Sequence, residues 1–242
     1  MTSAPVTHVI FDMDGLLLDT ESLYSVAQQQ ILNRYNKQFT WELKTKMMGR
    51  KALEAMEVLV ADLELQDQVT AEQLLKERTV VLDQLFADAA LMPGAERLVR
   101  HLAGHGIPMA VATSSSAAHF ELKTRRHGEL FALFHHIVTG DQVEHSKPHP
   151  EIFHKAALLF QGPHGSPPAP SPSSCLVFED APLGVEAGRA AGMRVVMVPD
   201  PQLDPDQSRA AQQVLGSLEQ FRPEAWGLPP YPGEGGEGGT QA

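Results

Sequence analysis

The stretch VIFDMDG at residues 9–15 decides the fold. Three apolar residues are followed by two carboxylates with one residue between them, and then by Gly15. A short apolar run that ends in polar residues is typical of a buried strand in a parallel sheet. Ligands bind beyond the carboxyl ends of the strands in an open α/β sheet, so we expect Asp12 and Asp14 to lie where a ligand binds.

Similar apolar runs recur along the chain, with segments of helical period between them. Strands are expected at residues 9–11, 107–112, 136–138, 176–178 and 195–198, and helices at residues 95–105, 151–160 and 181–191. Strands that alternate with helices favour an α/β fold with a doubly wound parallel-sheet (Rossmann-like) core.

Residues 20–89 break this alternation, because they show helical patterns and no convincing strand. We therefore expect an inserted α-helical cap there, and a discontinuous α/β core at residues 1–19 and 90–227. Residues 161–174 hold five prolines and four serines, which predicts a flexible loop. The glycine-rich residues 228–242 are expected to form a disordered tail.

The composition restricts the possible partners. The 242 residues carry 19 Lys and Arg against 30 Asp and Glu, a formal net charge of −11. Nucleic acid polymers and anionic membranes repel such a surface, so neither is expected as a partner. A small phosphorylated substrate is compatible with this charge, provided that a metal ion or a basic cluster supplies local positive charge.

The chain shows no targeting segment and no run near the ~20 apolar residues of a membrane span, which predicts a cytoplasmic protein. The single cysteine, Cys175, cannot form an internal disulfide. Because it lies in an apolar run, we expect a buried, inert thiol.

A second acidic pair, Glu179 and Asp180, follows the expected strand at residues 176–178. Neighbouring strands lie roughly 5 Å apart, so these residues can converge with Asp12 and Asp14. Carboxylates this close repel one another unless a cation lies between them or one is protonated. All-oxygen ligation with room for water and phosphate suits Mg²⁺. Taken alone, the second pair is also an ordinary helix start.

Two further segments offer groups that bind anions. Thr113 and Ser114 follow the second expected strand and place a hydroxyl and backbone N–H groups beside a helix start. Lys147 lies in the sequence KPHP, where Pro148 and Pro150 restrict the backbone. A polar loop and a solvated lysine are the plainer interpretations of these two segments.

In this order, the four elements resemble the motifs of haloacid dehalogenase-like hydrolases of the phosphatase branch. DMDG at residues 12–15 resembles the first motif, Thr113 the second, Lys147 the third, and ED at residues 179–180 the fourth. The resemblance extends from about residue 7 to residue 231, and it implies a Rossmann-like core with an inserted helical cap.

The resemblance also implies catalytic roles. Asp12 would be the nucleophile that forms an aspartyl-phosphate, and Asp14 the general acid and base. Lys147 would bridge the nucleophile and the phosphate, while Thr113 and Ser114 would bind phosphoryl oxygens.

The implied cofactor is Mg²⁺, with Asp12, Asp14, Asp180 and Glu179 as the candidate ligand residues. Asp12, Asp180 and the carbonyl group of Asp14 would hold the ion, while direct ligation by Glu179 stays open. The implied substrate is a small phosphorylated nucleoside or sugar. A nucleotide-like 5′-phosphate is favoured, and a broad range of sugar phosphates is the alternative.

The expected cap contributes Arg50 and Lys51, which match a turn that enters the active site in related enzymes and are therefore expected to contact substrate. A solvated helix start is the alternative interpretation of this pair. Tyr24 stands where the resembling sugar-phosphate mutases have histidine, which favours hydrolysis over transfer. A non-catalytic phosphate-binding module is the remaining alternative, but such a module needs no nucleophile and no acid.

Overall fold

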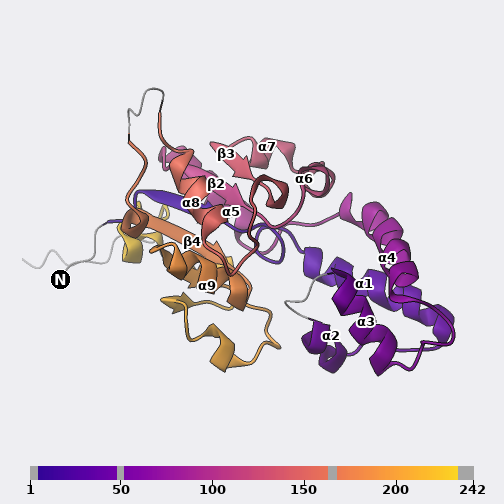
Figure 1. Cartoon of the computed structure of the whole chain (residues 1–242). Coiled ribbons are helices and arrows are strands. Elements are labelled where there is room, and N and C mark those ends of the chain that lie inside the picture. Colours follow the sequence, from indigo (N-terminus) through magenta and orange to yellow (C-terminus); the bar gives the residue numbers. More distant parts are fainter. Residues whose placement is uncertain (1–4, 48–51, 163–167, 234–242) are drawn as a thin grey trace, which may run out of the picture. The chain divides into compact units, whose positions relative to one another are not determined.

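The computed structural model describes residues 5–47, 52–162 and 168–233. The chain divides into two compact units, which are described separately here (Figure 1). The first unit comprises Met1–Leu18, Leu91–Phe120 and His127–Ala242, and the second comprises Asp19–Ala90 and Glu121–Arg126.

The first unit is built on a parallel sheet. Within the described residues the sheet has six strands in the order β3-β2-β1-β4-β5-β6, and every pairing is parallel. The strands are β1 (His8–Phe11), β2 (Met109–Ala112), β3 (His136–Val138), β4 (Cys175–Glu179), β5 (Arg194–Met197) and β6 (Gln213–Val214). The doubly wound α/β prediction is confirmed. β6 was not predicted, because two residues are too few to form a recognisable apolar run.

Helices cover both faces of this sheet (Figure 1). They are α5 (Ala95–Gly104), α7 (Gly128–Phe131), α8 (Glu151–Leu158) and α9 (Pro182–Ala190). A further helix, α6 (Ala117–Thr124), begins in this unit, but its residues from 121 onward belong to the second unit. Val9 and Phe11 of β1 belong to the core that contains α5 and α7. Ile10 belongs to the core that contains α8 and α9. Because both faces are buried, the strands read as unbroken apolar runs.

The second unit is helical. It contains α1 (Thr20–Leu32), α2 (Trp41–Met47), α3 (Ala52–Asp62) and α4 (Ala71–Phe86). Leu32, Leu59 and Leu74 lie in its own apolar cluster and are fully buried. Thr70 caps α4, since its hydroxyl accepts the N–H of Gln73 and the Gln73 side chain accepts the N–H of Thr70.

Residues 121–126 belong to this helical unit, and not to the α/β core where the sequence placed them. The Lys123 ammonium lies 4.2 Å from the ring centroid of Phe86. Arg126 forms an ion pair of 2.6 Å with Asp88. These contacts come from residues distant in sequence, so a boundary drawn from local patterns missed them.

The prediction of a disordered tail is wrong for residues 228–233. Leu228 and Tyr231 are each 3% exposed and belong to the core of the first unit. The Arg97 guanidinium lies 3.8 Å from the ring centroid of Tyr231, and His101 Nε2 contacts the carbonyl oxygen of Pro229 at 2.8 Å. The prediction followed the glycine-rich composition of the segment and overlooked these two apolar side chains. The rest of the predicted tail lies outside the described residues.

The predicted flexible loop at residues 161–174 is only partly described, because residues 163–167 lie outside the described ranges. Its last part, Pro172–Ser174, forms a 3-10 helix. The next residue, Cys175, is buried, and burial raises the pKa of its thiol to about 11. The prediction of a buried thiol is therefore confirmed.

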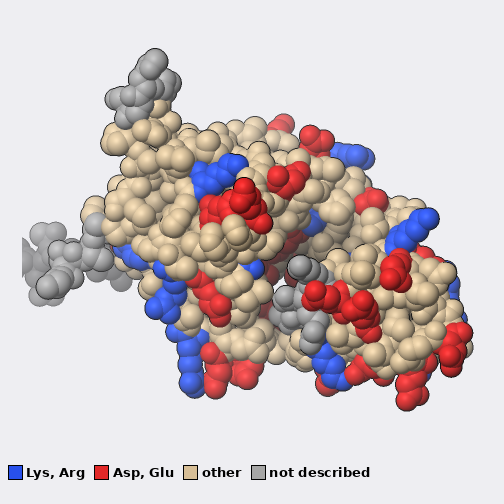
Figure 2. All heavy atoms as spheres, in the orientation of Figure 1, with Lys and Arg blue, Asp and Glu red and all other residues tan. Residues whose placement is uncertain are grey.

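Two properties of the structure bear on possible partners: the distribution of surface charge and the character of the helices. In Figure 2, acidic side chains form several groups on the face in view, and basic side chains are scattered between them. In the described part of the chain, no helix has the length and apolar character that crossing a membrane requires.

Candidate active site

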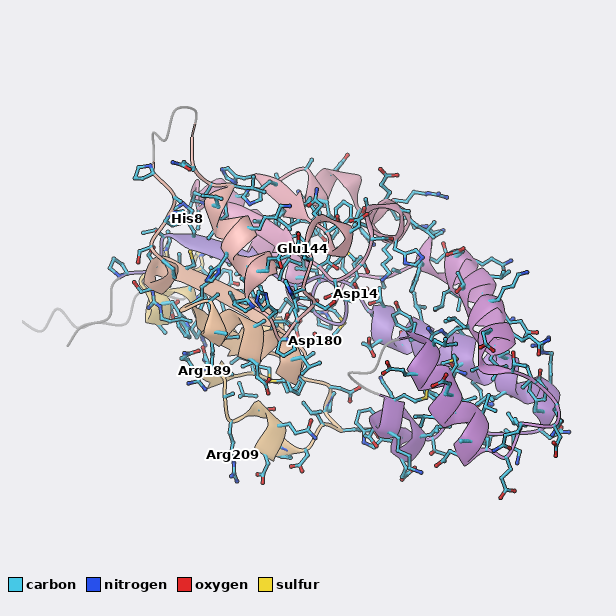
Figure 3. All side chains as sticks on the ribbon, viewed as in Figure 1. His8, Asp14, Glu144, Asp180, Arg189 and Arg209 are labelled. Carbon is cyan, nitrogen blue, oxygen red and sulfur yellow. The ribbon has the colours of Figure 1, made fainter. Side chains whose placement is uncertain are left out.

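The carboxyl ends of β1 and β4 bring the two acidic pairs together, and Figure 3 labels Asp14 and Asp180 there. Asp12 directly follows β1, and its N–H donates to the carbonyl oxygen of Phe178 in β4 (2.9 Å). Carboxylate oxygens of Asp12, Glu179 and Asp180 all lie within 4.8 Å of one another. Parallel pairing of β1 with β4 produces this cluster from residues more than 160 positions apart.

Lys147 enters this acidic cluster from the segment that precedes α8. Its ammonium donates to Asp12 Oδ1 at 2.5 Å, to Glu179 Oε1 at 2.6 Å and to the carbonyl oxygen of Ala112 at 3.1 Å. The Lys147 side chain is only 9% exposed, so these contacts replace its hydration. Lys147 is therefore a buried cation held between two carboxylates.

The charges of this cluster perturb the protonation equilibria. Burial raises the pKa of Asp12, and the carboxylates of Glu179 and Asp14 raise it further, while the Lys147 ammonium opposes them. Burial alone would lower the pKa of Lys147, but Asp12 and Glu179 more than offset this and raise it. Lys147 thus stays charged, and the excess of carboxylates favours a second cation beside Asp12.

Glu179 makes its contacts to protein groups. Oε1 accepts the Lys147 ammonium, and Oε2 accepts the N–H groups of Asp180 (3.1 Å) and Ala181 (3.3 Å). Gly184, in the first turn of α9, lies directly against this carboxylate, and a Cβ there would stand 1.9 Å from Oε1. Both oxygens of Glu179 therefore accept hydrogen bonds from protein groups, and one of these groups is the Lys147 ammonium.

Asp14 is held by two hydroxyl groups from the loop after β2. Ser115 Oγ donates to Asp14 Oδ2 at 2.8 Å, and Thr113 Oγ1 donates to the same oxygen at 3.2 Å. Thr113 Oγ1 also accepts the N–H of Ser115 at 3.0 Å. The next residue, Gly15, has a φ of 74°, a backbone conformation that favours glycine. The sequence did not single out Ser115, although the serine run after Thr113 was a signal for it.

The loop that carries Ser114 is braced by the loop after β3. The N–H of Gly140 donates to the carbonyl oxygen of Ser115 at 2.8 Å. A Cβ on Gly140 would stand 2.3 Å from the carbonyl oxygen of Ser114, so only glycine fits there. The Asp141 carboxylate accepts the N–H of Ala117 at 3.2 Å, at the start of α6. Ser114 itself is exposed.

Residues 6–192 match the sequence model of the haloacid dehalogenase-like hydrolases. The chain belongs to this family.

Among its relatives, "(DL)-glycerol-3-phosphatase 1, mitochondrial" of Arabidopsis thaliana is 52% identical over 93% of this chain and 75% of that protein. "Probable pseudouridine-5′-phosphatase" of Drosophila melanogaster is 48% identical over 93% of this chain and 96% of that protein. A haloacid dehalogenase family hydrolase from Deinococcus radiodurans, crystallised with phosphate and sodium, aligns with a TM-score of 0.76. That structure is 26% identical over 94% of this chain and 99% of its own. The chain is accordingly a phosphomonoester hydrolase.

The donor set of this hydrolase fits a hard divalent cation. Asp12 and Asp180 offer carboxylate oxygens, which are the ligands that Mg²⁺ prefers in proteins. Two other charged groups beside them already have partners: Lys147 contacts Asp12 Oδ1, and Asp14 accepts a hydrogen bond from Ser115.

The expected cap residues give less information. Arg50 and Lys51 lie outside the described residues. Tyr24 of α1 packs against Phe86, with ring centroids 5.3 Å apart, so it has a structural contact within the helical unit.

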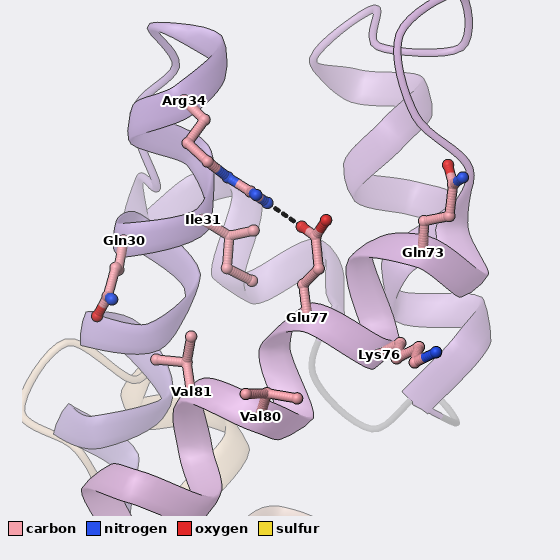
Figure 4. Close-up of a pocket in the computed structure, with 8 residues that line it drawn as sticks. All are labelled: Gln30, Ile31, Arg34, Gln73, Lys76, Glu77, Val80 and Val81. Carbon is pink, nitrogen blue, oxygen red and sulfur yellow. Dashed lines mark hydrogen bonds and ion pairs between the residues drawn. The ribbon is translucent and has the colours of Figure 1, made fainter.

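A groove of about 540 Å³ lies within the helical unit, between α4 and the C-terminal end of α1. Figure 4 shows its lining residues and the ion pair between Arg34, just after α1, and Glu77. None of the predicted site residues lines this groove.

Proposed function

We propose that this hydrolase dephosphorylates pseudouridine 5′-phosphate, with Mg²⁺ as cofactor and an aspartyl-phosphate on Asp12 as intermediate. The observation that supports the chemistry best is the contact of Lys147 with Asp12 Oδ1, beside an Asp14 that is held by two hydroxyl groups. The 48% identity to the Drosophila protein supports the choice of substrate. So does the resemblance of residues 11–21, 90–96 and 175–182 to pseudouridine-5′-phosphatases.

In the first half-reaction, a carboxylate oxygen of Asp12 forms a bond to phosphorus, and the bond from phosphorus to the ester oxygen breaks. The leaving oxygen keeps the electron pair of that bond and takes a proton from Asp14. Since Lys147 occupies Oδ1 of Asp12, we assign the attack to Oδ2. The Lys147 ammonium also offsets the repulsion between the carboxylate and the phosphate dianion.

In the second half-reaction, Asp14 accepts a proton from water as the water oxygen bonds to phosphorus. The bond from phosphorus to Asp12 then breaks, which releases phosphate and restores the carboxylate. Ser115 and Thr113 keep Asp14 in one orientation for both steps. The N–H of Ser114 is proposed to bind a phosphoryl oxygen. Mg²⁺, when bound by Asp12 and Asp180, supplies further positive charge to the transferred phosphoryl group.

A second candidate substrate is glycerol 3-phosphate, because a relative named for that activity is 52% identical over 93% of this chain. The two substrates share the phosphoryl group and differ in the leaving alcohol. The groups around Asp12 and Asp14 act on the shared part, so they do not distinguish between the two substrates.

Phosphate release decides between these substrates. The panel compares pseudouridine 5′-phosphate, uridine 5′-phosphate, glycerol 3-phosphate and fructose 1-phosphate at equal Mg²⁺, each with and without EDTA. We expect the highest kcat/KM with pseudouridine 5′-phosphate and no release with EDTA. Faster release from glycerol 3-phosphate would establish the second candidate. Equal rates across the panel would indicate a broad-range phosphatase, and no release at all would favour a binding module.

A further inference from the structure

We propose that His145, His149 and Glu151 form a second metal site, which binds a divalent transition-metal ion such as Zn²⁺. One ligand atom from each of the three residues lies within 4.8 Å of the other two. All three residues belong to one short segment that leads into α8, and Figure 3 labels Glu144 at its start. This proposal does not depend on the phosphatase assignment.

The spacing of the ligand atoms suits a small ion. His145 Nδ1 lies 2.9 Å from Glu151 Oε2, and His149 Nδ1 lies 3.8 Å from the same oxygen. Two ligand atoms bound at about 2.0–2.1 Å to a tetrahedral Zn²⁺ stand about 3.3 Å apart. The two observed distances lie on either side of this value. An ion that binds here would widen the first of these two spacings and narrow the second, and both histidine side chains are exposed enough to move.

The carboxylate is already fixed. The N–H of Glu144 donates to Glu151 Oε1 at 2.9 Å, and the N–H of His145 donates to Oε2 at 3.0 Å. These backbone hydrogen bonds, followed by the His145 side chain, lower the pKa of Glu151 to about 2. Glu151 therefore offers a charged oxygen that two backbone hydrogen bonds hold in place.

The two imidazole rings face one another. Their centroids lie 4.5 Å apart at a tilt of 35°, and the two side chains are 60% and 50% exposed. The bound ion replaces the proton between His145 Nδ1 and Glu151 Oε2. It also replaces the N–H of Glu151, which now contacts His149 Nδ1 at a long 3.3 Å. Water fills the remaining coordination positions, as expected for an exposed site with three protein ligands.

The donor set distinguishes this site from the acidic cluster. Two imidazole nitrogens and one carboxylate suit Zn²⁺, Co²⁺ or Ni²⁺, whereas the oxygens of Asp12 and Asp180 suit Mg²⁺. His145 and His149 stand two residues before and two residues after Lys147. A bound ion therefore ties the two sides of the segment that carries this buried lysine to the first turn of α8.

The test is a calorimetric titration of the full chain with Zn²⁺ while saturating Mg²⁺ fills the acidic cluster. We expect one Zn²⁺ site per chain that Mg²⁺ does not compete for. The variant His149→Asn should weaken it by at least about tenfold, since even indirect partners of metal ligands contribute 10–100-fold. The control His105→Asn changes an exposed histidine of another close pair, His101 and His105, whose ring centroids also lie 4.5 Å apart. It should leave Zn²⁺ affinity unchanged.

Co²⁺ in place of Zn²⁺ gives a second measurement, because its visible absorption reports nitrogen ligation. We expect the wild-type spectrum to be lost in His149→Asn and kept in His105→Asn, while thermal melting without metal shows both variants folded. The proposal is overturned if the wild type binds no Zn²⁺ under these conditions. Competition by Mg²⁺, or equal affinity in His149→Asn, would also overturn it.

Discussion

Asp12 carries a charge that its surroundings only partly compensate. Burial and the neighbouring carboxylates raise its pKa, which means that the charged form costs folding stability at neutral pH. This cost is absent below the unfolded pKa of an aspartate, about 3.9, where Asp12 is protonated in both states. The free energy of unfolding therefore decreases as the pH rises from there through the raised pKa of the folded state. A cation beside Asp12 would offset this cost, and the proposed mechanism places Mg²⁺ there.

The variant Asp12→Asn tests the role of Asp12 in catalysis and its cost to folding stability separately. We expect phosphate release to fall by several orders of magnitude, as when other enzymes lose their nucleophile. We also expect the melting temperature without metal to stay the same or to rise, because the uncompensated charge is removed while Glu179 still pairs with Lys147. Near-native turnover in this variant would exclude Asp12 as the nucleophile.

Ser115 is expected to contribute to turnover through Asp14. Ser115→Ala removes a hydrogen bond of 2.8 Å to this carboxylate, which is shorter than the 3.2 Å bond from Thr113. A hydrogen bond to a charged group contributes about 1.5–3 kcal/mol, so we expect kcat to fall by about tenfold or more. Ser114→Ala is the matched control, because the role proposed for Ser114 uses its backbone N–H, and its kcat should stay near the wild-type value. Equal kcat values for the two variants would contradict the role of Ser115.

Cys175 should be unreactive in the folded protein. Burial raises the pKa of its thiol to about 11, so the reactive thiolate is scarce at pH 8 and becomes abundant only when the pH approaches the raised value. We expect negligible labelling by a thiol reagent at pH 8 in buffer and complete labelling in denaturant. Rapid labelling of the native protein at pH 8 would show that the thiol is accessible.

At the scale of elements, strand ends and one helix turn build the site. β1 and β4 deliver the carboxylates, and the first turn of α9 supports Glu179 through the missing side chain of Gly184. Gly184→Ala should displace Glu179 and, with it, Lys147. Because a shift of about 1 Å can cost roughly 10²-fold in rate, we expect a loss of that order in kcat/KM.

The control for this helix substitution is Gly104→Ala at the end of α5, where an added Cβ meets nothing within 4 Å. Its kcat/KM should equal that of the wild type, and its free energy of unfolding should be unchanged or slightly higher. If Gly184→Ala keeps full activity in the same assay, the proposed support of Glu179 by α9 is wrong.

The element scale also shows what the sequence can predict. Apolar runs that end in acidic residues predicted β1 and β4, because a strand buried on both faces has an unbroken apolar pattern. The cluster around Asp12 followed from the parallel neighbourhood of these strands. The hydrogen bonds of Asp14 to Ser115, and of Glu179 to Lys147, depend on the positions of individual atoms, which no pattern of residue types contains.

At the scale of the whole molecule, contacts between segments distant in sequence determine which unit a segment belongs to and whether it is ordered. Composition predicts neither. Lys123 and Arg126 join the helical unit through Phe86 and Asp88, although they follow the second strand in sequence. In the same way, Tyr231 belongs to the core of the first unit, although the glycine-rich composition of residues 228–242 predicted disorder. Composition describes the average character of a segment, whereas a single buried side chain such as Tyr231 can hold that segment against the core.

Truncation tests this packing of the C-terminal segment. A chain that ends at Gly227 loses Leu228 and Tyr231, and we expect its free energy of unfolding to fall by about 2–5 kcal/mol, as for large buried side chains. A chain that ends at Gly233 keeps both side chains and serves as the reference in urea unfolding. Equal stability of the two chains would support the original prediction of a disordered tail from residue 228.

The direct measurement of the central claim is the covalent intermediate on Asp12. The full chain is mixed with pseudouridine 5′-phosphate and Mg²⁺, quenched in acid within the first turnover, digested and analysed by mass spectrometry. We predict a phosphoryl group on the peptide that contains Asp12, localised to that residue and absent from Asp12→Asn. Turnover of the substrate with no phosphorylated peptide, or with the phosphoryl group on another residue, would contradict the account.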